Sequence, residues 1–445
     1  MAERSPRGTN RFDDRACSGA LARRRVRMGA LLGMLALIAL RAPPAWSEDG
    51  ASGVWEAITQ GKPVVDVRGR IEIADQTGLG RSEAYTLRTR LGYGTKPFHG
   101  VSAYMDFENI ATPTQSTYFN PDDLPNTNNL TVIAEPPGTE VNQGYLLIDR
   151  PDWLGSSLKG GRQRIVFDDS RFVGDVNWRQ NQQTFDALYA QTSAGVDALT
   201  ARYAYIGHVD RIFGGGGNNP QLQDFDSNSN LINVSFTRFR QASLVGFVYL
   251  LDLTLPGTLN PQANSSKSFG ARLTGSIGVA EGWTFSYQGS YAYQSQYAGK
   301  LPDYSADYGL VELSLAWQKL GSVGIGYEFL GSDGGVQQFT TPLATLHKFN
   351  GWADVFLDNG GPDGLQDFHA SLSPKLPWQL QMTLVYHRFW SDARGAVLGN
   401  EFDTSLGRPI GKYFDVLFKT AYFDSTTRSP RPTTYRIWFD VNFKF

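Results

Sequence analysis

The sequence predicts an all-β protein, a single-chain transmembrane β-barrel of about eighteen antiparallel strands. Three observations predict it: apolar and polar residues alternate over many runs of about ten residues, short and long connections alternate between these runs, and the last run ends at Phe445. Lipid offers no hydrogen bonds, so a membrane sheet must close, with apolar residues outward and polar residues inward. A barrel of about sixteen strands is the nearest alternative.

The final run, residues 435–445, shows the alternation most clearly. One face carries Tyr435, Ile437, Phe439, Val441, Phe443 and Phe445. The other face carries Arg436, Asp440, Asn442 and Lys444, with Trp438 as the exception. A soluble sheet packed on a core gives the same alternation, but a terminal Phe on the last strand resembles the signal read by the outer-membrane barrel assembly machinery. We therefore expect that machinery and lipid as partners, in the outer membrane of a Gram-negative bacterium.

The same alternation recurs along the chain, over residues 65–73, 85–93, 101–108, 283–294, 311–318, 323–329 and 380–387. Short connections are expected at 94–100, 193–196, 279–282, 319–322 and 374–377, and long ones at 111–139, 169–182, 208–229, 252–266 and 332–363. If the last strand ends at the periplasm, the short turns are periplasmic and the long loops extracellular. Residues 349–356 also alternate, but placing them in a long loop keeps the strand number even, as bacterial barrels require.

Outward aromatic residues are expected to form two girdles, because amphipathic rings favour the level of the lipid headgroups. The girdle at the short turns would contain Tyr93, Trp283, Trp317 and Trp378. The girdle at the long loops would contain Tyr85, Tyr293, Tyr386, Tyr422 and Tyr435.

Residues 1–47 have the features of a secretory signal peptide. Arginines at 23–25 and 27 precede the apolar run Gly29–Leu40, and Ala45-Trp46-Ser47 provides a small-residue cleavage site. The apolar run is too short to span a bilayer as a helix, and Met28 is a possible true start. We expect a periplasmic lead at 48–63 and the barrel at 64–445. The only cysteine, Cys17, would leave with the signal, so disulfides play no part in stability.

Composition and motif spacing exclude several classes of function. Removal of residues 1–47, with nine basic and three acidic residues, leaves 32 basic and 40 acidic residues and no basic block, so no nucleic-acid partner is expected. The five histidines, His99, His208, His347, His369 and His387, show no metal-ligand spacing. No nucleophile motif stands out, and no cofactor is expected. The sequence therefore favours a protein that is not an enzyme.

An eighteen-stranded barrel is wide enough to hold water, and its inward side chains then set selectivity. The predicted frame directs basic side chains inward at Arg68, Arg70, Arg88, Arg90, Arg202, Arg272 and Arg436, and Arg162 and Arg164 share one face. The inward acids are Asp66, Glu72, Asp106, Glu108, Glu312, Glu328 and Asp440. Either the arginines form a track that attracts anions, or each pairs with an acid of a neighbouring strand and stiffens the wall.

Several segments resemble the alginate-export family of outer-membrane porins. They are YTLRTRLGYGT at 85–95, GRQRIVFDDSRFVGDVNWRQNQQTFDA at 161–187, GYEFLGSD at 326–333 and FTTPLATLHKFNGWAD at 339–354. The resemblance implies an eighteen-stranded monomeric barrel with a basic, polymer-conducting lumen partly occluded by loops. It implies an anion track of Arg68, Arg88, Arg90, Arg162 and Arg164, and a pore-mouth loop containing Arg171, Trp178, Arg179 and Asn181. In a purely structural role, Arg171 and Arg179 would order this loop by pairing with Asp168, Asp169, Asp175 and Asp186.

These features favour an outer-membrane channel for passive diffusion or export of anionic or polar solutes, including an anionic polysaccharide such as alginate. A dedicated alginate exporter should show a strongly positive lumen, whereas this one has about as many inward acids as arginines. The first alternative is an uptake porin for small carboxylates or sugars. The others are an outer-membrane hydrolase and a structural barrel with a plugged lumen.

Overall fold

The computed structural model describes residues 48–445, apart from 123–124, 215–218, 240, 256–257 and 428. The predicted signal peptide, with Cys17 and Met28, lies outside the described residues. The chain divides into two units, residues 1–56 and 57–445. Helix α3, Glu48–Thr59, precedes the first strand in the chain. Within the described part of the chain, no helix has both the length and the apolar character needed to cross a bilayer.

The second unit consists of long antiparallel strands joined in chain order. The first half contains β1 (Lys62–Gln76), β2 (Ser82–Gly94), β3 (Val101–Ala111), β4 (Gly138–Arg150), β5 (Ser156–Gln163), β6 (Thr184–Thr192), β7 (Leu199–Asp210), β8 (Asp224–Phe239), β9 (Ala242–Leu251) and β10 (Leu253–Thr254). The second half contains β11 (Ser266–Ala280), β12 (Trp283–Ser295), β13 (Ser305–Trp317), β14 (Gly321–Leu330), β15 (Leu365–Pro374), β16 (Gln381–Trp390), β17 (Val397–Ile410), β18 (Phe414–Ser425) and β19 (Thr434–Lys444). Short helical turns in the connections are η1 (Gln115–Thr117), α4 (Pro220–Gln223) and η2 (Leu346–Lys348).

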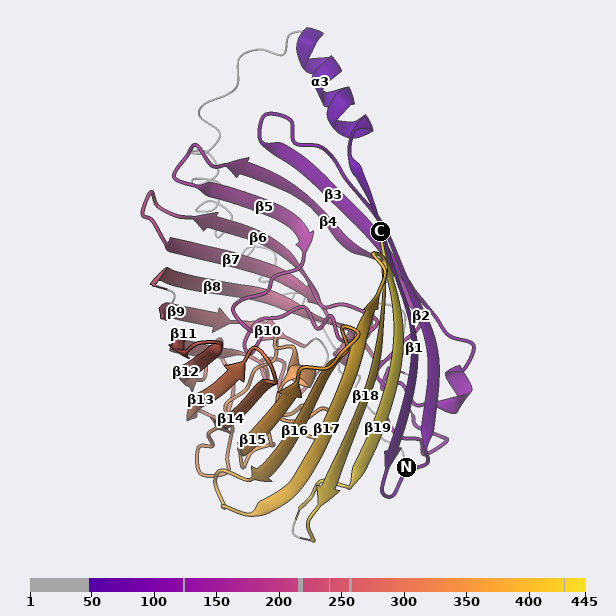
Figure 1. The fold of residues 1–445 in the computed structure, drawn as a ribbon. Helices are drawn as coiled ribbons and strands as arrows, with labels where there is room; N and C mark the ends of the chain where they lie inside the picture. The colour runs from indigo at the N-terminus through magenta and orange to yellow at the C-terminus, as the bar shows by residue number, and fades with distance from the viewer. Residues whose placement is uncertain (1–47, 123–124, 215–218, 240, 256–257, 428) are drawn as a thin grey trace, which may run out of the picture. The chain divides into compact units, whose positions relative to one another are not determined.

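The sheet closes on itself, because β1 pairs with both β2 and β19 (Figure 1). The short segment β10 continues β9 beyond a break at Asp252, since both pair with β8. Counted in this way, the nineteen segments of the described sheet form a closed barrel of eighteen strands. The prediction of an eighteen-stranded antiparallel barrel is confirmed.

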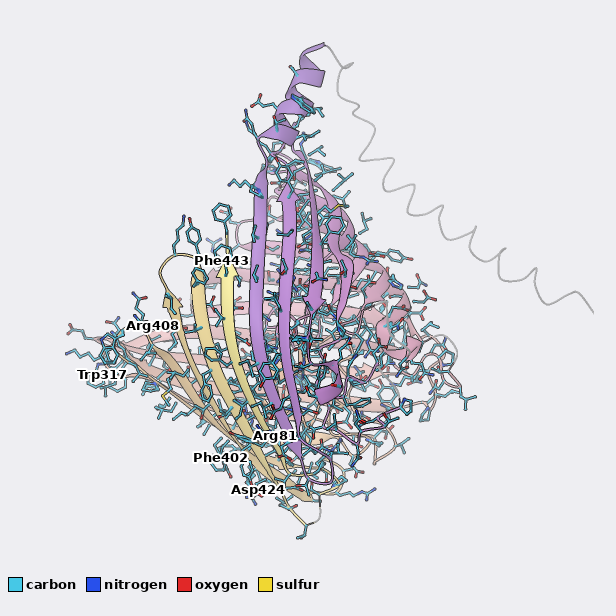
Figure 2. The ribbon with its side chains drawn as sticks, turned by 90° about the vertical axis from the view of Figure 1, so that its right-hand side faces the viewer. Arg81, Trp317, Phe402, Arg408, Asp424 and Phe443 are labelled. Atoms are coloured by element: carbon cyan, nitrogen blue, oxygen red, sulfur yellow. The ribbon has the colours of Figure 1, made fainter. Side chains whose placement is uncertain are left out.

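The alternation of side chains follows the predicted frame in the closing strands. Phe439 is 43% exposed on the outer face, whereas its neighbour Asp440 is 2% exposed inside. Arg70 of β1 lies opposite Asp440 of β19, which makes a charged row on the inner wall. Phe402, labelled in Figure 2, is 57% exposed on the outer surface. The apolar outer face is therefore the surface that meets lipid.

Connections of two kinds separate the strands, as predicted. One end of the barrel carries short turns, such as 95–100 between β2 and β3, and the other carries the long connections, such as 112–137 between β3 and β4. The connection expected at 208–229 is shorter, because β7 extends to Asp210 and β8 starts at Asp224. Residues 349–356 lie in the connection between β14 and β15, outside any strand.

The inside of the barrel contains a hydrophobic core that the alternation did not predict. Buried residues of two connections, among them Val173, Leu343 and Phe356, pack with inward aromatic residues of the wall such as Phe389 and Trp438. Burial of such side chains stabilises a folded chain by about 1.5–3 kcal/mol each. Part of the lumen is therefore filled by folded loops.

A charged residue placed on the outer face of a strand tests whether that face meets lipid. Phe439 lies in the middle of β19, so Phe439→Arg is expected to lower the free energy of unfolding from lipid vesicles by about 2–4 kcal/mol. Tyr435→Arg, at the strand end, is the control and should cost about 0–1 kcal/mol. Urea titration in vesicles measures both values, and equal costs at the two depths would contradict the frame.

Candidate functional site

Two connections fold inward and meet inside the barrel. We call residues 164–183, between β5 and β6, the first inner loop, and residues 331–364, between β14 and β15, the second inner loop. Val173 bridges to Leu343, and the amide of Gly174 donates to the Leu343 carbonyl at 2.8 Å. The amide of Thr345 donates to the Ser170 carbonyl at 3.0 Å. The two inner loops therefore form one folded body in the lumen.

Arg179 joins this body to the wall at β1. Its guanidinium contacts Asp354 at 2.5 Å, Glu72 at 3.5 Å and Glu135 at 3.6 Å, and all four side chains are at least nine-tenths buried. Removing one partner from such a buried ionic group costs about 3–5 kcal/mol, because the others keep an uncompensated charge. Arg68 adds hydrogen bonds to the carbonyls of Asn177 and Trp178 at 3.1 and 3.0 Å.

Arg171 forms the second attachment, to the wall at β14. It donates to Glu328 of β14 at 2.7 Å and to the amide oxygen of Asn350 at 3.0 Å. The Asn350 amide donates in turn to Glu328 at 2.6 Å, so both inner loops share one carboxylate. Charge-assisted hydrogen bonds of this kind are about twice as strong as hydrogen bonds between neutral groups.

Trp178 lies at the centre of an aromatic cluster between the loops and the wall. Its ring stacks on His347 at 4.2 Å, and the Arg70 guanidinium lies 4.3 Å from the same ring. Trp438 meets Trp178 edge-on at 5.5 Å. Trp438 was the exception to the polar inner face of β19, and it faces inward because the first inner loop supplies an apolar neighbour.

His347 is held between two charged groups. Its Nδ1 lies 2.7 Å from Asp354, and Lys419 Nζ lies 2.7 Å from its Nε2. Burial lowers the pKa of His347 to about 3, and Lys419 acts in the same direction against Asp354. Burial alone would raise the pKa of Asp354, but His347 and Arg179 hold that pKa below its usual range. At neutral pH the ring is therefore neutral, donates to Asp354 and accepts from Lys419.

The arginines expected to line the pore face inward, but most are paired with acids. The pairs are Arg70 with Asp440 and Glu135, Arg88 with Asp66, Arg90 with Glu108, Arg436 with Glu72, Arg162 with Asp186 and Asp210, Arg164 with Asp175, and Arg272 with Asp169. Arg202 donates to Asn233 and Ser235. Asp106 accepts from Asn142. This geometry matches the wall-stiffening alternative, while the anion track stays a prediction.

The expected ion pairs between the arginines and the aspartates of the pore-mouth loop do not form. Arg171 and Arg179 reach Glu328, Glu72, Glu135 and Asp354 on other elements. The four nearby acids instead pair elsewhere: Asp168 with Asn233, Asp169 with Arg272, Asp175 with Arg164 and Asp186 with Arg162. Asn181 is buried and donates to the Pro136 carbonyl. These long-range partners follow from the inward fold of the loop, which local spacing does not reveal.

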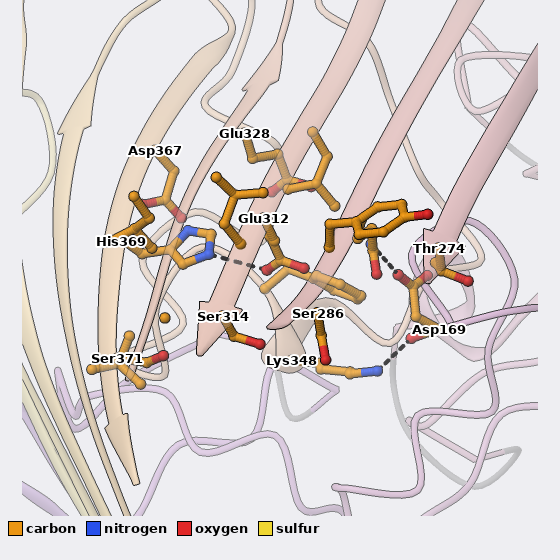
Figure 3. A pocket seen from close by; sticks show the side chains of 18 of the residues that line it. Asp169, Thr274, Ser286, Glu312, Ser314, Glu328, Lys348, Asp367, His369 and Ser371 are labelled. Atoms are coloured by element: carbon orange, nitrogen blue, oxygen red, sulfur yellow. Dashed lines mark hydrogen bonds and ion pairs between the residues drawn. The ribbon is translucent and has the colours of Figure 1, made fainter. Parts of the chain in front are cut away.

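An open cavity of about 830 Å³ remains beside the loop body, against the inner face of β11–β16 (Figure 3). Its wall offers hydroxyl groups from Thr274, Ser276, Ser286, Ser314 and Ser371. Two cations border it: Arg272, 3.0 Å from Asp169, and Lys348, which donates to the Asp169 carbonyl at 2.7 Å. Glu312, 42% exposed, lies beside His369 and lines this space together with Asp169, Glu328 and Asp367. Apolar side chains such as Leu310 and Phe349 line the rest of the cavity, so its surface combines charges of both signs, hydroxyl groups and apolar groups.

Three potential metal ligands lie in the same wall. Among the described residues, the side chains of Asp367, His369 and His387 lie close enough together to bind one metal ion. The spacing of the histidines in the sequence does not reveal this group, because the pairing of β15 with β16 brings His369 and His387 together. The inward positions of His369 and His387 on adjacent predicted strands were the available signal.

These features define the class: a transmembrane β-barrel with the outer-membrane porin fold, and the predicted outer-membrane location agrees with it. Residues 149–207 match the family model described as alginate export, which confirms the resemblance over this segment. The segment runs from the end of β4 into β7 and includes the first inner loop. A comparison with curated proteins finds no match.

Solved structures show the same barrel at low sequence identity. OpdK of Pseudomonas aeruginosa, solved with vanillate, has a TM-score of 0.65 and 13% identity, covering 87% of this chain and 99% of that one. OccAB4 of Acinetobacter baumannii has a TM-score of 0.65 and 12% identity, covering 88% and 100%. OpdO of Pseudomonas aeruginosa has a TM-score of 0.63 and 13% identity, covering 88% and 99%. The similarity concerns the fold.

Proposed function

We propose that this protein is a channel for passive diffusion of small polar solutes, carboxylates among them, across the outer membrane. The observation that carries the proposal is the division of the lumen. The loop body covers the inner face near β1, β2 and β19, and a cavity of about 830 Å³ with polar and apolar lining groups stays open along β11–β16. A passage of this size favours small solutes over bulky ones.

The side chains of the cavity support a solute with hydroxyl and carboxylate groups. Arg272 presents a guanidinium that recognises carboxylates in fork geometry, and Lys348 adds a second cation at the same rim. The serine and threonine hydroxyls of β11–β15 replace part of the hydration shell of a polar solute. The structure of OpdK with vanillate, a small carboxylate, is consistent with this class of solute.

Export of an anionic polysaccharide is the second candidate. The match of residues 149–207 to the alginate-export model favours it, because that segment contains the loop that shapes the lumen. For a polymer to pass, the loop body would have to move away from the arginines of β1 and β2. The two candidates therefore differ in whether the inner loops stay in place during transport.

Planar-bilayer recording with small uronates, neutral sugars and alginate as blockers tests the proposal. We expect open-channel conductance that uronate monomers reduce, and an Arg272→Gln variant with uronate affinity about five- to twentyfold weaker, since a charge-assisted bond is lost. Arg150→Gln is the matched control, because Arg150 is exposed on the turn side and pairs only with Asp152 among the described residues. Strong block by alginate with none by uronates would favour polymer export, and absence of conductance would contradict both candidates.

A further inference from the structure

We propose that Asp367, His369 and His387 form a binding site for a divalent transition-metal ion such as Zn²⁺ in the wall of the open cavity. Each side chain offers one ligand atom, and these atoms lie within 4.8 Å of one another. Two imidazoles and a carboxylate are a donor set that zinc prefers in proteins. The site stands on its own geometry, whereas its effect on transport rests on the function proposed above.

The register of two neighbouring strands brings the ligands together. His369 of β15 lies directly opposite His387 of β16, with ring centroids 5.5 Å apart. Asp367 shares the inner face with His369, two residues earlier on the same strand. His387 Nδ1 lies 2.9 Å from Asp367, so the carboxylate and the ring are already in contact. Ligands on rigid strands are held in place before the metal arrives.

A glycine on β14 allows a second carboxylate to orient His369. Gly326 pairs with Glu312 on one side and His369 on the other, and a Cβ at Gly326 would collide with the His369 ring. Across this gap, His369 Nε2 meets Glu312 at 3.1 Å (Figure 3). Metal-bound histidines usually direct their other nitrogen to such a carboxylate, which fixes the ring. His369 Nδ1 has no hydrogen-bond partner among the described residues and is the nitrogen left for a metal.

The cavity provides the remaining coordination position. Bonds of about 2.1 Å place the ligands of a tetrahedral zinc about 3.4 Å apart. Ligand atoms as much as 4.8 Å apart would close by up to about 1.4 Å, whereas Asp367 and His387 Nδ1, at 2.9 Å, would move slightly apart. The same three residues line the cavity, so water or a solute carboxylate completes the coordination. Imidazole ligands favour zinc, copper and nickel over magnesium and calcium. A bound ion narrows the passage, and we infer that it lowers conductance.

Zinc titration of the full chain in detergent tests the site itself. With ZnCl₂ alone and a competing chelating dye at pH 7.5, we expect one ion per chain and at least tenfold weaker binding in His369→Ala and His387→Ala. His208→Ala is the matched control, since His208 on β7 also faces two carboxylates, Asp210 and Asp226, at 3.7 and 3.8 Å. His369→Cys, which supplies another zinc ligand, should retain binding.

Each outcome is decisive. No stoichiometric zinc binding, or equal loss in His208→Ala, would overturn the site, provided that heat-modifiable gel migration shows folded barrels. In bilayers, zinc should lower wild-type conductance, chelation should restore it, and His369→Ala should not respond. Zinc that binds without changing conductance would support the site and contradict the proposed solute path. Normal conductance without zinc binding would overturn the site and leave the channel function in place.

Discussion

Replacing residues 166–182 with a four-residue Gly-Asn-Gly-Ser linker is expected to raise single-channel conductance about three- to fivefold, because the loop body occupies part of a barrel wide enough for water. The barrel should survive the change. Gln163 and Phe185 are direct partners on β5 and β6, so a short connection closes the hairpin. Loss of Arg179 and Arg171 also releases the second inner loop from its contacts at Asp354 and Asn350. Planar-bilayer recording measures the conductance, and the permeation of larger oligosaccharides should rise with it.

Arg394→Ala is the control for this loop replacement. Arg394 pairs with Asp363 at 3.0 Å near the end of the second inner loop, but its side chain is 73% exposed. Exposed ion pairs contribute about 0–1 kcal/mol, so this variant should conduct like the wild type. Unchanged conductance in a folded linker variant would mean that the first inner loop does not limit the passage.

The wall of the barrel was predictable because lipid imposes one rule on every strand. In residues 435–445, each outward position is apolar, and this alternation is visible in the sequence. The even strand number kept residues 349–356 out of the wall, and the structure places them in the second inner loop. The two-residue alternation and the even number of strands together determine the strands, and neither requires knowledge of long-range contacts.

The contents of the lumen could not be predicted in this way. Alternation predicts that Arg70 faces inward, but not whether it meets water or protein. In the structure its partners are Asp440 across the barrel seam and Glu135 and Trp178 from distant connections. Such contacts join residues far apart in the sequence, and the inward fold of the loops creates them. The arginines predicted to form an anion track are therefore the same residues that form ion pairs in the structure, because the alternation predicts their inward direction but not their partners.

Trp438 shows where a sequence signal was present but incomplete. A tryptophan among inward polar residues breaks the rule for a water-filled barrel. Its partners, Trp178 and His347, come from the two inner loops. The break in the pattern was visible in the sequence, but only the fold identifies the residues that surround Trp438.

Acidification is expected to loosen the loop body through His347. The pKa of His347 is about 3 where it is buried between Asp354, Lys419 and Arg179, whereas a histidine in water has a pKa of about 6.5. Below pH 6.5 the released ring binds a proton and the buried ring does not. The buried arrangement therefore loses stability as the pH falls from 6.5 towards 3, by about 1.4 kcal/mol per pH unit. At pH 5 the loss is about 2 kcal/mol, a factor of about thirty in the equilibrium between docked and released loops.

The neighbouring acid does not oppose this effect in the same range. The pKa of Asp354 lies below its usual range, so the stability that this carboxylate contributes is present above pH 3.8 and is lost only below it. Within the pair of His347 and Asp354, the response between pH 7 and pH 5 should therefore come from histidine. Bilayer recording at both values should show larger conductance and more frequent current fluctuations at pH 5.

Two substitutions separate His347 from the other titrating groups. His347→Gln can hydrogen-bond to Asp354 but does not titrate, so its conductance should change little between pH 7 and pH 5. His208→Gln removes a histidine of β7 that contacts Asp210 and Asp226 of the barrel wall, and it should keep the wild-type response. If His347→Gln opened at pH 5 as the wild type does, the acid response would arise in the wall of the barrel. A wild-type protein with the same conductance at both pH values would show that other contacts, such as Arg171 with Glu328, hold the loops against the loss at His347.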